Sequence, residues 1–281
     1  MLKIAMDTAG DLAEGWAEEY NIDLIPINII HKNKTYLQGI DLNYEDFYRI
    51  VEEEQSIPST SQPSPFQFLE FYRFIAKPGD DILSIHVTDK LSGTMDSARQ
   101  AAAELKGDYN VIPFDSATGS ICMGMMCTEA RQMERDGKSL SAILKRLEKI
   151  RNKMELVFTV DSLKYARMSG RVKHLQAALA SLLNVKPIIE LKNGNIEMGE
   201  KVRSRSKSIK ALIEKMKSKV GETKVRMAVV HARAFEEGQD LLEKVKAQFN
   251  ASEVIFSEIT ISLAAHFGPG TLGLAAYPIK L

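Results

Sequence analysis

The chain has 281 residues, with 37 Lys and Arg against 37 Asp and Glu, and 44% of its residues are hydrophobic. This composition is typical of a globular protein and excludes disordered and collagen-like chains. The zero net charge gives no general argument for nucleic-acid binding. No apolar run reaches the roughly 20 residues that cross a bilayer, and the first residues lack the long apolar segment of a signal peptide. We therefore expect a cytoplasmic protein.

Strand and helix patterns alternate through the first half of the chain. Short apolar runs rich in β-branched residues predict strands at 3–6, 24–30, 82–87 and 111–114. Patterns of helical period predict helices at 11–20, 44–54, 65–74, 94–105 and 121–136. This order is typical of an α/β fold in which helices cover both faces of a mostly parallel sheet. We assign it to an N-terminal domain of residues 1–154.

The two cysteines, Cys122 and Cys127, lie five residues apart in an apolar, Met-rich stretch. The spacing is not that of a C-x-x-C motif, and the surrounding sequence offers no histidine as a metal ligand. We expect both to be core residues in a reducing compartment. The sequence predicts neither a metal nor a cofactor.

The second half begins after a charged helix predicted over 140–153. Strands are predicted at 156–160, 186–191, 196–198, 225–231, 253–258 and 272–277, and helices at 175–183, 206–219 and 235–249. Asn193-Gly194 indicates a hairpin between two of these strands, because Asn-Gly readily adopts positive φ angles. The pattern predicts a C-terminal α+β domain of residues 155–281 with a partly antiparallel sheet.

Three polar segments lie far apart in the sequence, at 60–64, 91–94 and 266–271. Ligands of parallel sheets bind beyond the carboxyl ends of strands, where such loops lie. Hydroxyls, N–H groups at glycine-containing turns and the imidazole of His266 together suit an anionic head group. From the residues alone, Ser92 could equally cap a helix, and Thr60 could be an ordinary hydroxyl before a proline-rich turn.

Five motifs carry a resemblance to a known family. In order, they are Thr60-Ser61-Gln62-Pro63-Ser64-Pro65; Leu91-Ser92-Gly93-Thr94; Ser162-Leu163-Lys164-Tyr165 followed by Gly170-Arg171-Val172; Lys186-Pro187-Ile188-Ile189; and His266-Phe267-Gly268-Pro269-Gly270-Thr271-Leu272-Gly273. Over essentially the whole chain, the sequence resembles the DegV family of bacterial fatty-acid-binding proteins. It departs from the family pattern at Asp7-Thr8-Ala9, where Asp-Ser-Thr is usual, and at Ser169, where glycine is usual.

The resemblance implies that a long-chain fatty acid binds between the two domains as the ligand of a protein that is not an enzyme. The implied ligand-binding residues are Thr60, Ser92, Gly93, Arg171 and His266, with Ser61 and Thr94 as alternates. A hydroxyl donates one rotatable hydrogen bond to a carboxyl oxygen without adding charge. The guanidinium of Arg171 and the imidazole of His266 would offset the cost of burying that carboxylate.

The resemblance also implies a partner protein, an ATP-dependent fatty acid kinase that phosphorylates the carboxylate of the bound ligand. It implicates Arg203 in docking this kinase. Residues 201–226 around it contain ten Lys or Arg and two acids. This stretch could instead contact an anionic membrane, or be a solvated strand edge and helix face. It has no interleaved aromatic residues for stacking on bases, so we predict no nucleic-acid binding.

An alternative reading makes the chain an esterase-like hydrolase, with Ser92 as nucleophile and His266 as base. Ser92 lies in Lys90-Leu91-Ser92-Gly93-Thr94, which lacks the first glycine of the G-x-S-x-G elbow. No motif supplies the acid of a triad. The carrier reading is therefore favoured over the hydrolase.

Overall fold

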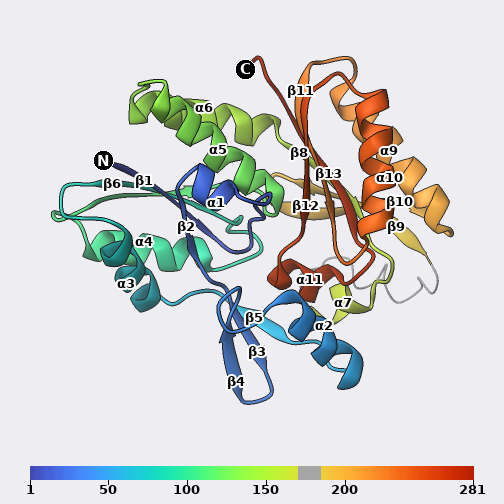
Figure 1. The fold of residues 1–281 in the computed structure, drawn as a ribbon, viewed down its shortest axis with the longest axis horizontal. Coiled ribbons are helices and arrows are strands. Elements are labelled where there is room, and N and C mark those ends of the chain that lie inside the picture. Colours follow the sequence, from blue (N-terminus) through green and yellow to red (C-terminus); the bar gives the residue numbers. More distant parts are fainter. Residues whose placement is uncertain (170–184) are drawn as a thin grey trace. The chain divides into compact units, whose positions relative to one another are not determined.

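A computed structural model describes residues 1–169 and 185–281, which divide into two compact units, Met1–Arg151 and Asn152–Leu281 (Figure 1). The first unit holds a parallel sheet and the second a mixed sheet, so the predicted fold class is confirmed. The helix predicted over 175–183 lies outside the described residues. No helix in the described part of the chain is long and apolar enough to cross a membrane.

The central sheet of the first unit is wholly parallel. Its strands are β1 (Leu2–Asp7), β2 (Ile22–Ile25), β6 (Asp81–His86) and β7 (Asn110–Asp115), in the order β2-β1-β6-β7. Ile4, Ala5 and Met6 of β1 are consecutive and all fully buried. Burial of consecutive residues requires cover on both faces of the sheet, as expected for parallel strands.

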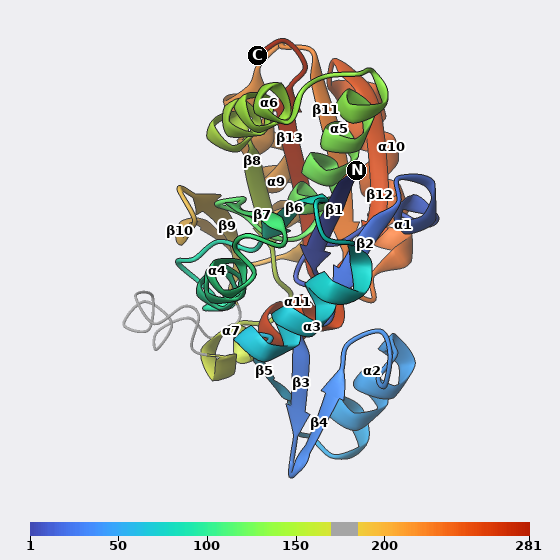
Figure 2. The same cartoon turned by 90° about the vertical axis from the view of Figure 1, so that its left-hand side faces the viewer.

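Helices supply that cover. α3 (Pro65–Ile75) and α4 (Thr94–Glu104) lie on one face of the sheet, and α5 (Ile121–Arg135) lies on the other (Figures 1 and 2). The helix predicted over 11–20 is reduced to α1 (Trp16–Glu19), because Gly15 adopts a left-handed conformation at its N-cap. α6 (Leu140–Lys153) has the predicted bounds, and the division of the chain into two units falls within its last three residues.

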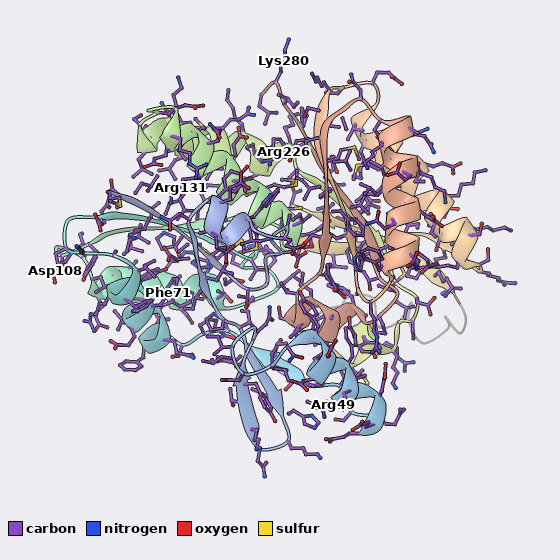
Figure 3. The ribbon with its side chains drawn as sticks, viewed as in Figure 1. Arg49, Phe71, Asp108, Arg131, Arg226 and Lys280 are labelled. Atoms are coloured by element: carbon purple, nitrogen blue, oxygen red, sulfur yellow. The ribbon has the colours of Figure 1, made fainter. Side chains whose placement is uncertain are left out.

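Arg131 of α5 forms hydrogen bonds with main-chain carbonyl groups near β1 and so links the helix to the sheet (Figure 3). Its side chain is 5% exposed. The guanidinium donates to the carbonyl oxygens of Tyr20 at 2.8 Å, Asn21 at 3.0 Å and Leu2 at 3.2 Å. A single buried cation thereby satisfies three main-chain acceptors where α1 ends and β1 begins.

A second, antiparallel sheet of the first unit was only partly predicted. It consists of β3 (Asn28–His31), β4 (Lys34–Leu37) and β5 (Ser59–Ser61), in the order β4-β3-β5, and α2 (Tyr44–Glu53) lies between β4 and β5 in the chain. The single strand predicted over 24–30 was wrong. The chain leaves the parallel sheet after Ile25 because Pro26 has no N–H to continue the ladder, and it re-enters pairing at Asn28.

The sheet of the second unit is mixed. Its strands are β8 (Glu155–Thr159), β9 (Lys186–Lys192), β10 (Asn195–Val202), β11 (Val225–His231), β12 (Ala251–Glu258) and β13 (Leu272–Pro278), in the order β10-β9-β8-β13-β11-β12. The pair β11–β12 is parallel and the other pairs are antiparallel. Asn193 and Gly194 have φ angles of 49° and 81°, which confirms the predicted hairpin turn.

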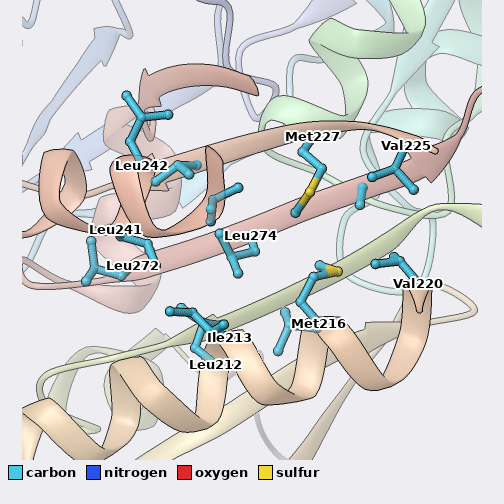
Figure 4. Packing of buried hydrophobic residues seen from close by; sticks show 14 of the residues in the cluster. Leu212, Ile213, Met216, Val220, Val225, Met227, Leu241, Leu242, Leu272 and Leu274 are labelled. Atoms are coloured by element: carbon cyan, nitrogen blue, oxygen red, sulfur yellow. The ribbon is translucent and has the colours of Figure 1, made fainter. Parts of the chain in front are cut away.

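Among the described residues, α9 (Arg205–Val220) and α10 (Phe235–Gln248) pack on this sheet. The core they enclose contains Leu212 and Met216 of α9, Leu241 of α10 and Leu274 of β13 (Figure 4). All four side chains are fully buried. Two shorter helices, α7 (Lys164–Ser169) and α11 (Ile261–Phe267), contact each other beside the sheet. They carry two of the sequence motifs.

Candidate functional site

Thr60 is held by the small antiparallel sheet. It lies on β5 opposite Ile29 of β3 and is half-buried. Just beyond the strand, the carbonyl of Gln62 accepts a hydrogen bond from Nδ2 of Asn28 at 3.1 Å. Asn28 is itself buried, and its Oδ1 accepts from Nε2 of Gln67 at 3.2 Å. The loop that follows Thr60 is therefore tied to both β3 and α3.

The start of α3 completes this anchoring. Ser64 is its N-cap: the Gln67 N–H donates to Oγ of Ser64 at 3.2 Å, and the Ser64 N–H donates to Oε1 of Gln67 at 2.8 Å. Pro65 follows at the first helical position, where its missing N–H costs nothing. Such a capping box fixes the direction in which the chain enters the helix. The Ser-x-x-Gln spacing was its sequence signal, whereas nothing local indicated the role of Asn28.

Ser92 lies in the turn between β6 and α4. Its N–H donates to the carbonyl of Thr88 at 3.2 Å, and its Oγ accepts from the N–H of Thr94 at 3.3 Å. The hydroxyls of Ser92 and Thr94 are also 2.8 Å apart. Ser92 thus supports the start of α4, the alternative role left open by its sequence, while remaining half-buried. Thr94 is fully buried, and its hydroxyl points to that of Ser92.

Gly93 brings the two hydroxyl-bearing loops together. A Cβ added at this position would lie 2.8 Å from Nε2 of Gln62, so the side-chain amide already occupies that space. The φ of Gly93 is −77°, a value open to any residue. Close contact with Gln62, rather than backbone conformation, is therefore what favours glycine here. Gln62 lies inside the motif of residues 60–65, but the motif alone did not indicate this contact.

His266 lies in the last turn of α11 and is half-buried. The loop that follows is held by close packing at two glycines. Gly268 has φ +78°, and an added Cβ would collide with the ring of Tyr165 on α7. Gly270 also has φ +78°, and its added Cβ would lie 2.7 Å from Cβ of Asp161. The Thr271 hydroxyl donates to the carbonyl of Gly268 at 2.8 Å. The Gly-Pro-Gly turn is therefore rigid.

Lys186 has a structural partner that its motif did not predict. Its ammonium group donates to the carbonyl oxygen of Asp161 at 3.1 Å and forms an ion pair with the carboxylate of the same residue. Asp161 is also the residue against which Gly270 packs. The Lys-Pro and Gly-Pro-Gly motifs thus meet at the end of β8.

The predicted site residues fall into three groups. Thr60, Ser61, Ser92, Gly93 and Thr94 belong to the first unit, where the contact between Gln62 and Gly93 joins their loops. His266 and Arg203 belong to the second unit, and Arg203 is exposed. Arg171 lies outside the described residues.

Within residues 1–169 and 185–281, His, Cys, Asp and Glu form no group of three suited to a metal. Cys122 and Cys127 are free and fully buried. Burial raises the pKa of Cys122 to about 12 and that of Cys127 further. Neither thiol is poised to become a reactive thiolate.

Comparisons with known proteins cover both units. The sequence model described as "Uncharacterised protein, DegV family" matches residues 1–279. Protein DegV of Bacillus subtilis is 30% identical over 275 residues, which are 97% of this chain and 98% of that protein. The structure of a fatty-acid-binding DegV family protein from Thermus thermophilus has a TM-score of 0.91 at 29% identity, over 99% of each chain. A stearic-acid-binding protein from Eubacterium ventriosum has a TM-score of 0.91 at 26% identity, over 99% of this chain and 98% of that one.

Proposed function

Because this chain belongs to the DegV family, we propose that it is a carrier that binds a long-chain fatty acid and holds its carboxylate with Thr60 and Ser92. The observation that supports this assignment is the contact of Gln62 with Gly93, which joins the two loops that bear these hydroxyls. Each hydroxyl can donate one hydrogen bond to a carboxylate oxygen. Fatty acid binding by the Thermus and Eubacterium proteins supports the choice of ligand.

The position of Ser92 suits a negative charge. It directly precedes Gly93, the N-cap of α4, and α4 has 11 residues. The N-terminus of a helix carries a partial positive charge and favours anions beside it. We assign Arg171 and His266 to the same head-group network from their motifs, as the cations that keep a buried carboxylate ionised.

The acyl chain supplies most of the binding free energy in this proposal. Burial of about 14 methylenes at ~0.8 kcal/mol each gives a gross gain of about 11 kcal/mol. Association and ordering costs reduce this value, yet enough remains for tight binding. The hydroxyls therefore set the orientation and chemical selectivity of the head group more than the overall affinity.

The carrier does not need chemistry of its own. We propose that a separate kinase transfers the γ-phosphoryl group of ATP to the carboxylate oxygen, yielding an acyl phosphate and ADP while the carrier positions the acid. Arg203 is exposed between β10 and α9 and is our candidate for the kinase contact. An anionic membrane is the second candidate partner of the same basic stretch. Two free, buried cysteines suit a carrier that works in the cytoplasm.

Ligand capture is tested by native mass spectrometry of the purified protein, followed by extraction and identification of any lipid. We expect one fatty acid per chain. Ser92→Ala and Thr60→Ala should each weaken fatty acid binding several-fold. Ser59→Ala is the matched control, because Ser59 is exposed and neighbouring residues of a strand point to opposite faces. A protein that is empty when purified and takes up no added fatty acid would refute the carrier.

The kinase contact needs a separate test. Arg203→Ala should slow acyl phosphate formation by a cognate kinase without changing fatty acid affinity. Lys192→Ala removes an exposed cation from the preceding β9–β10 hairpin and serves as the control. Equal rates for both variants and the unmodified protein would remove Arg203 from the docking surface. Rapid hydrolysis of a chromogenic acyl ester that is lost in Ser92→Ala would instead support the alternative function, an esterase-like hydrolase.

A further inference from the structure

A series of hydrogen bonds runs through the interior of the first unit, and only Asp7 among its residues lies in a segment already compared with the family pattern. Oδ2 of Asp7 lies 3.0 Å from Nδ1 of His86, and Nε2 of His86 lies 2.8 Å from Oγ of Ser84. The Tyr72 hydroxyl donates to the same Oγ at 2.9 Å. All four residues have zero exposure. They come from three elements, β1, β6 and α3.

The donors and acceptors fit one arrangement of protons. Oδ2 of Asp7 already accepts the Val87 N–H at 3.0 Å, so the carboxylate acts as an acceptor and Nδ1 of His86 donates to it. With His86 as the Nδ1–H tautomer, Nε2 accepts from the Ser84 hydroxyl, and Oγ accepts from Tyr72. The order is Tyr72 to Ser84 to His86 to Asp7. Burial raises the pKa of Tyr72, which keeps its proton in place.

This order of Ser, His and Asp is that of a hydrolase triad, but the environment is different. Ser84 has no exposed surface on which a substrate could react. Its oxygen is also occupied by the Tyr72 hydroxyl. The ring of Phe68 packs edge-on against His86, with centroids 5.1 Å apart. These groups are therefore fixed structural partners rather than nucleophile and base.

At one end of this series of hydrogen bonds, Asp7 fixes the main-chain turn that leads to Ser92. Asp7 accepts from the N–H of Ala9 at 2.9 Å and from that of Val87 at 3.0 Å, so it fixes the turns after two neighbouring strands. The residue after Val87 is Thr88, whose carbonyl accepts the Ser92 N–H. The residue anchored by Asp7 is therefore followed directly by the residue that binds the Ser92 N–H.

At the other end of the series, Tyr72 belongs to the helix that follows Thr60. Tyr72 lies on α3, the helix that begins with the Ser64–Gln67 capping box. Gln67 in turn binds Asn28, which holds the carbonyl of Gln62. Each end of this buried series of hydrogen bonds is thus linked to one of the two hydroxyl-bearing loops.

We propose that Tyr72, Ser84, His86 and Asp7 form a positioning relay that sets the Ser92 turn against α3 and so aligns the two hydroxyls with a carboxylate. The relay rests on the proposed function, because the carboxylate is its object. Its members touch no ligand and act through the main chain. The relay therefore affects selectivity for the head group and leaves the contribution of the acyl chain unchanged.

Two ligands of equal chain length separate this role from general stability. The probes are a long-chain fatty acid and the corresponding fatty alcohol, which lacks the carboxylate. Tyr72→Phe keeps the ring and removes the donor to Ser84, and we expect about fivefold weaker binding of the acid, the scale of one lost hydrogen bond. Alcohol binding should change less than twofold. Equal weakening of both ligands, or of neither, would overturn the relay.

His86 provides a matched pair of variants. The amide of His86→Asn falls near the position of Nδ1 and can still donate to Asp7, whereas that of His86→Gln falls near Nε2. We expect the Asn variant to retain more acid binding than the Gln variant. The reverse ranking, or equal values, would contradict the proposed role of Asp7. Nitrogen NMR of His86 in the unmodified protein should show the Nδ1–H tautomer, and an Nε2–H tautomer would refute the relay directly.

The outcomes also distinguish this inference from the carrier function. Unmodified protein that binds no fatty acid would refute the carrier. Normal uptake that Tyr72→Phe and both His86 variants leave unchanged would refute the relay alone. Ser84→Ala covers the case in which a His86 variant fails to fold, because it removes only a hydroxyl. Its acid binding should fall while its alcohol binding stays the same.

Discussion

The side-chain amide of Gln62 occupies the space that a Cβ of residue 93 would need, so Gln62 and Gly93 form a direct contact between two loops 31 positions apart. Gln62 follows Thr60 by two residues and Gly93 directly follows Ser92, so the contact joins the loops that carry the two hydroxyls assigned to the head group. A glutamine amide is the far end of a flexible side chain and can move at small cost. Changes at this contact should therefore alter the site more than the fold.

Gly93→Ala tests this contact. The new Cβ would displace the amide of Gln62, which lies 2.8 Å from its position. We expect fatty acid affinity to fall about fivefold, the effect of about 1 kcal/mol. The free energy of unfolding should fall by less than about 1 kcal/mol, since the backbone angles of Gly93 suit alanine. Calorimetric titration and urea unfolding measure the two quantities.

Gln62→Ala supplies the control through a double-mutant cycle. Once the amide is absent, Gly93→Ala has nothing to displace. Its effect on fatty acid affinity should shrink toward zero in the Gln62→Ala background. Full additivity of the two changes would mean that Gly93 acts without Gln62.

Gly268 presents the opposite case, in which the fold depends on glycine. Its φ of +78° and ψ of 172° lie in a region that is essentially restricted to glycine, and an added Cβ would collide with the ring of Tyr165. Gly268→Ala should lower the free energy of unfolding by about 3 kcal/mol. Gly137→Ala is the control, because Gly137 has φ +73° but no atom within 4 Å of an added Cβ. It should cost about 1 kcal/mol, and equal costs would exclude a role for the Tyr165 contact.

The sequence predicted the parallel sheet because its strands contain short apolar runs, such as Ile4 to Met6, that few other structures could bury. It did not predict β5, since Ser59-Thr60-Ser61 has neither an apolar run nor an alternating pattern. That strand owes its existence to pairing with β3 and positions one of the two head-group hydroxyls.

The buried relay was equally hidden from the sequence. Asp7 and His86 are 79 positions apart, and each looks locally like the end of an ordinary strand. Only the neighbouring places of β1 and β6 in the sheet bring them together. The motifs led to Thr60 and Ser92, but the residues that support these two are set by tertiary structure.

Arg131 should be among the most sensitive positions of the first unit. Arg131→Met keeps much of the side-chain volume but leaves the carbonyls of Tyr20, Asn21 and Leu2 without their donor. We expect a loss of about 3 kcal/mol in the free energy of unfolding, because buried acceptors without partners are costly. Arg99→Met is the control: Arg99 is 50% exposed in its ion pair with Asp96, and such pairs contribute about 0–1 kcal/mol. Similar losses in both variants would show that the three main-chain bonds contribute little.

His231 should make stability depend on pH. It ends β11, is 4% exposed and packs against the ring of Phe256, with centroids 5.0 Å apart. Burial lowers its pKa below the ordinary value of 6.5, and the charge of Glu258 offsets only part of this shift. Below pH 6.5 the unfolded chain therefore binds a proton that the folded protein resists.

A base with a lowered pKa in the folded state stabilises the fold above pH 6.5 and loses that contribution as the pH falls toward its folded pKa. His231→Phe removes the titrating group while keeping a ring beside Phe256. Urea unfolding at pH 7.5 and pH 5.5 should show a smaller loss of stability on acidification for this variant than for the unmodified protein. Glu258→Gln should show a larger loss, because the charge that assists protonation is gone. An unchanged pH dependence in His231→Phe would mean that His231 is equally easy to protonate in the folded and unfolded chains.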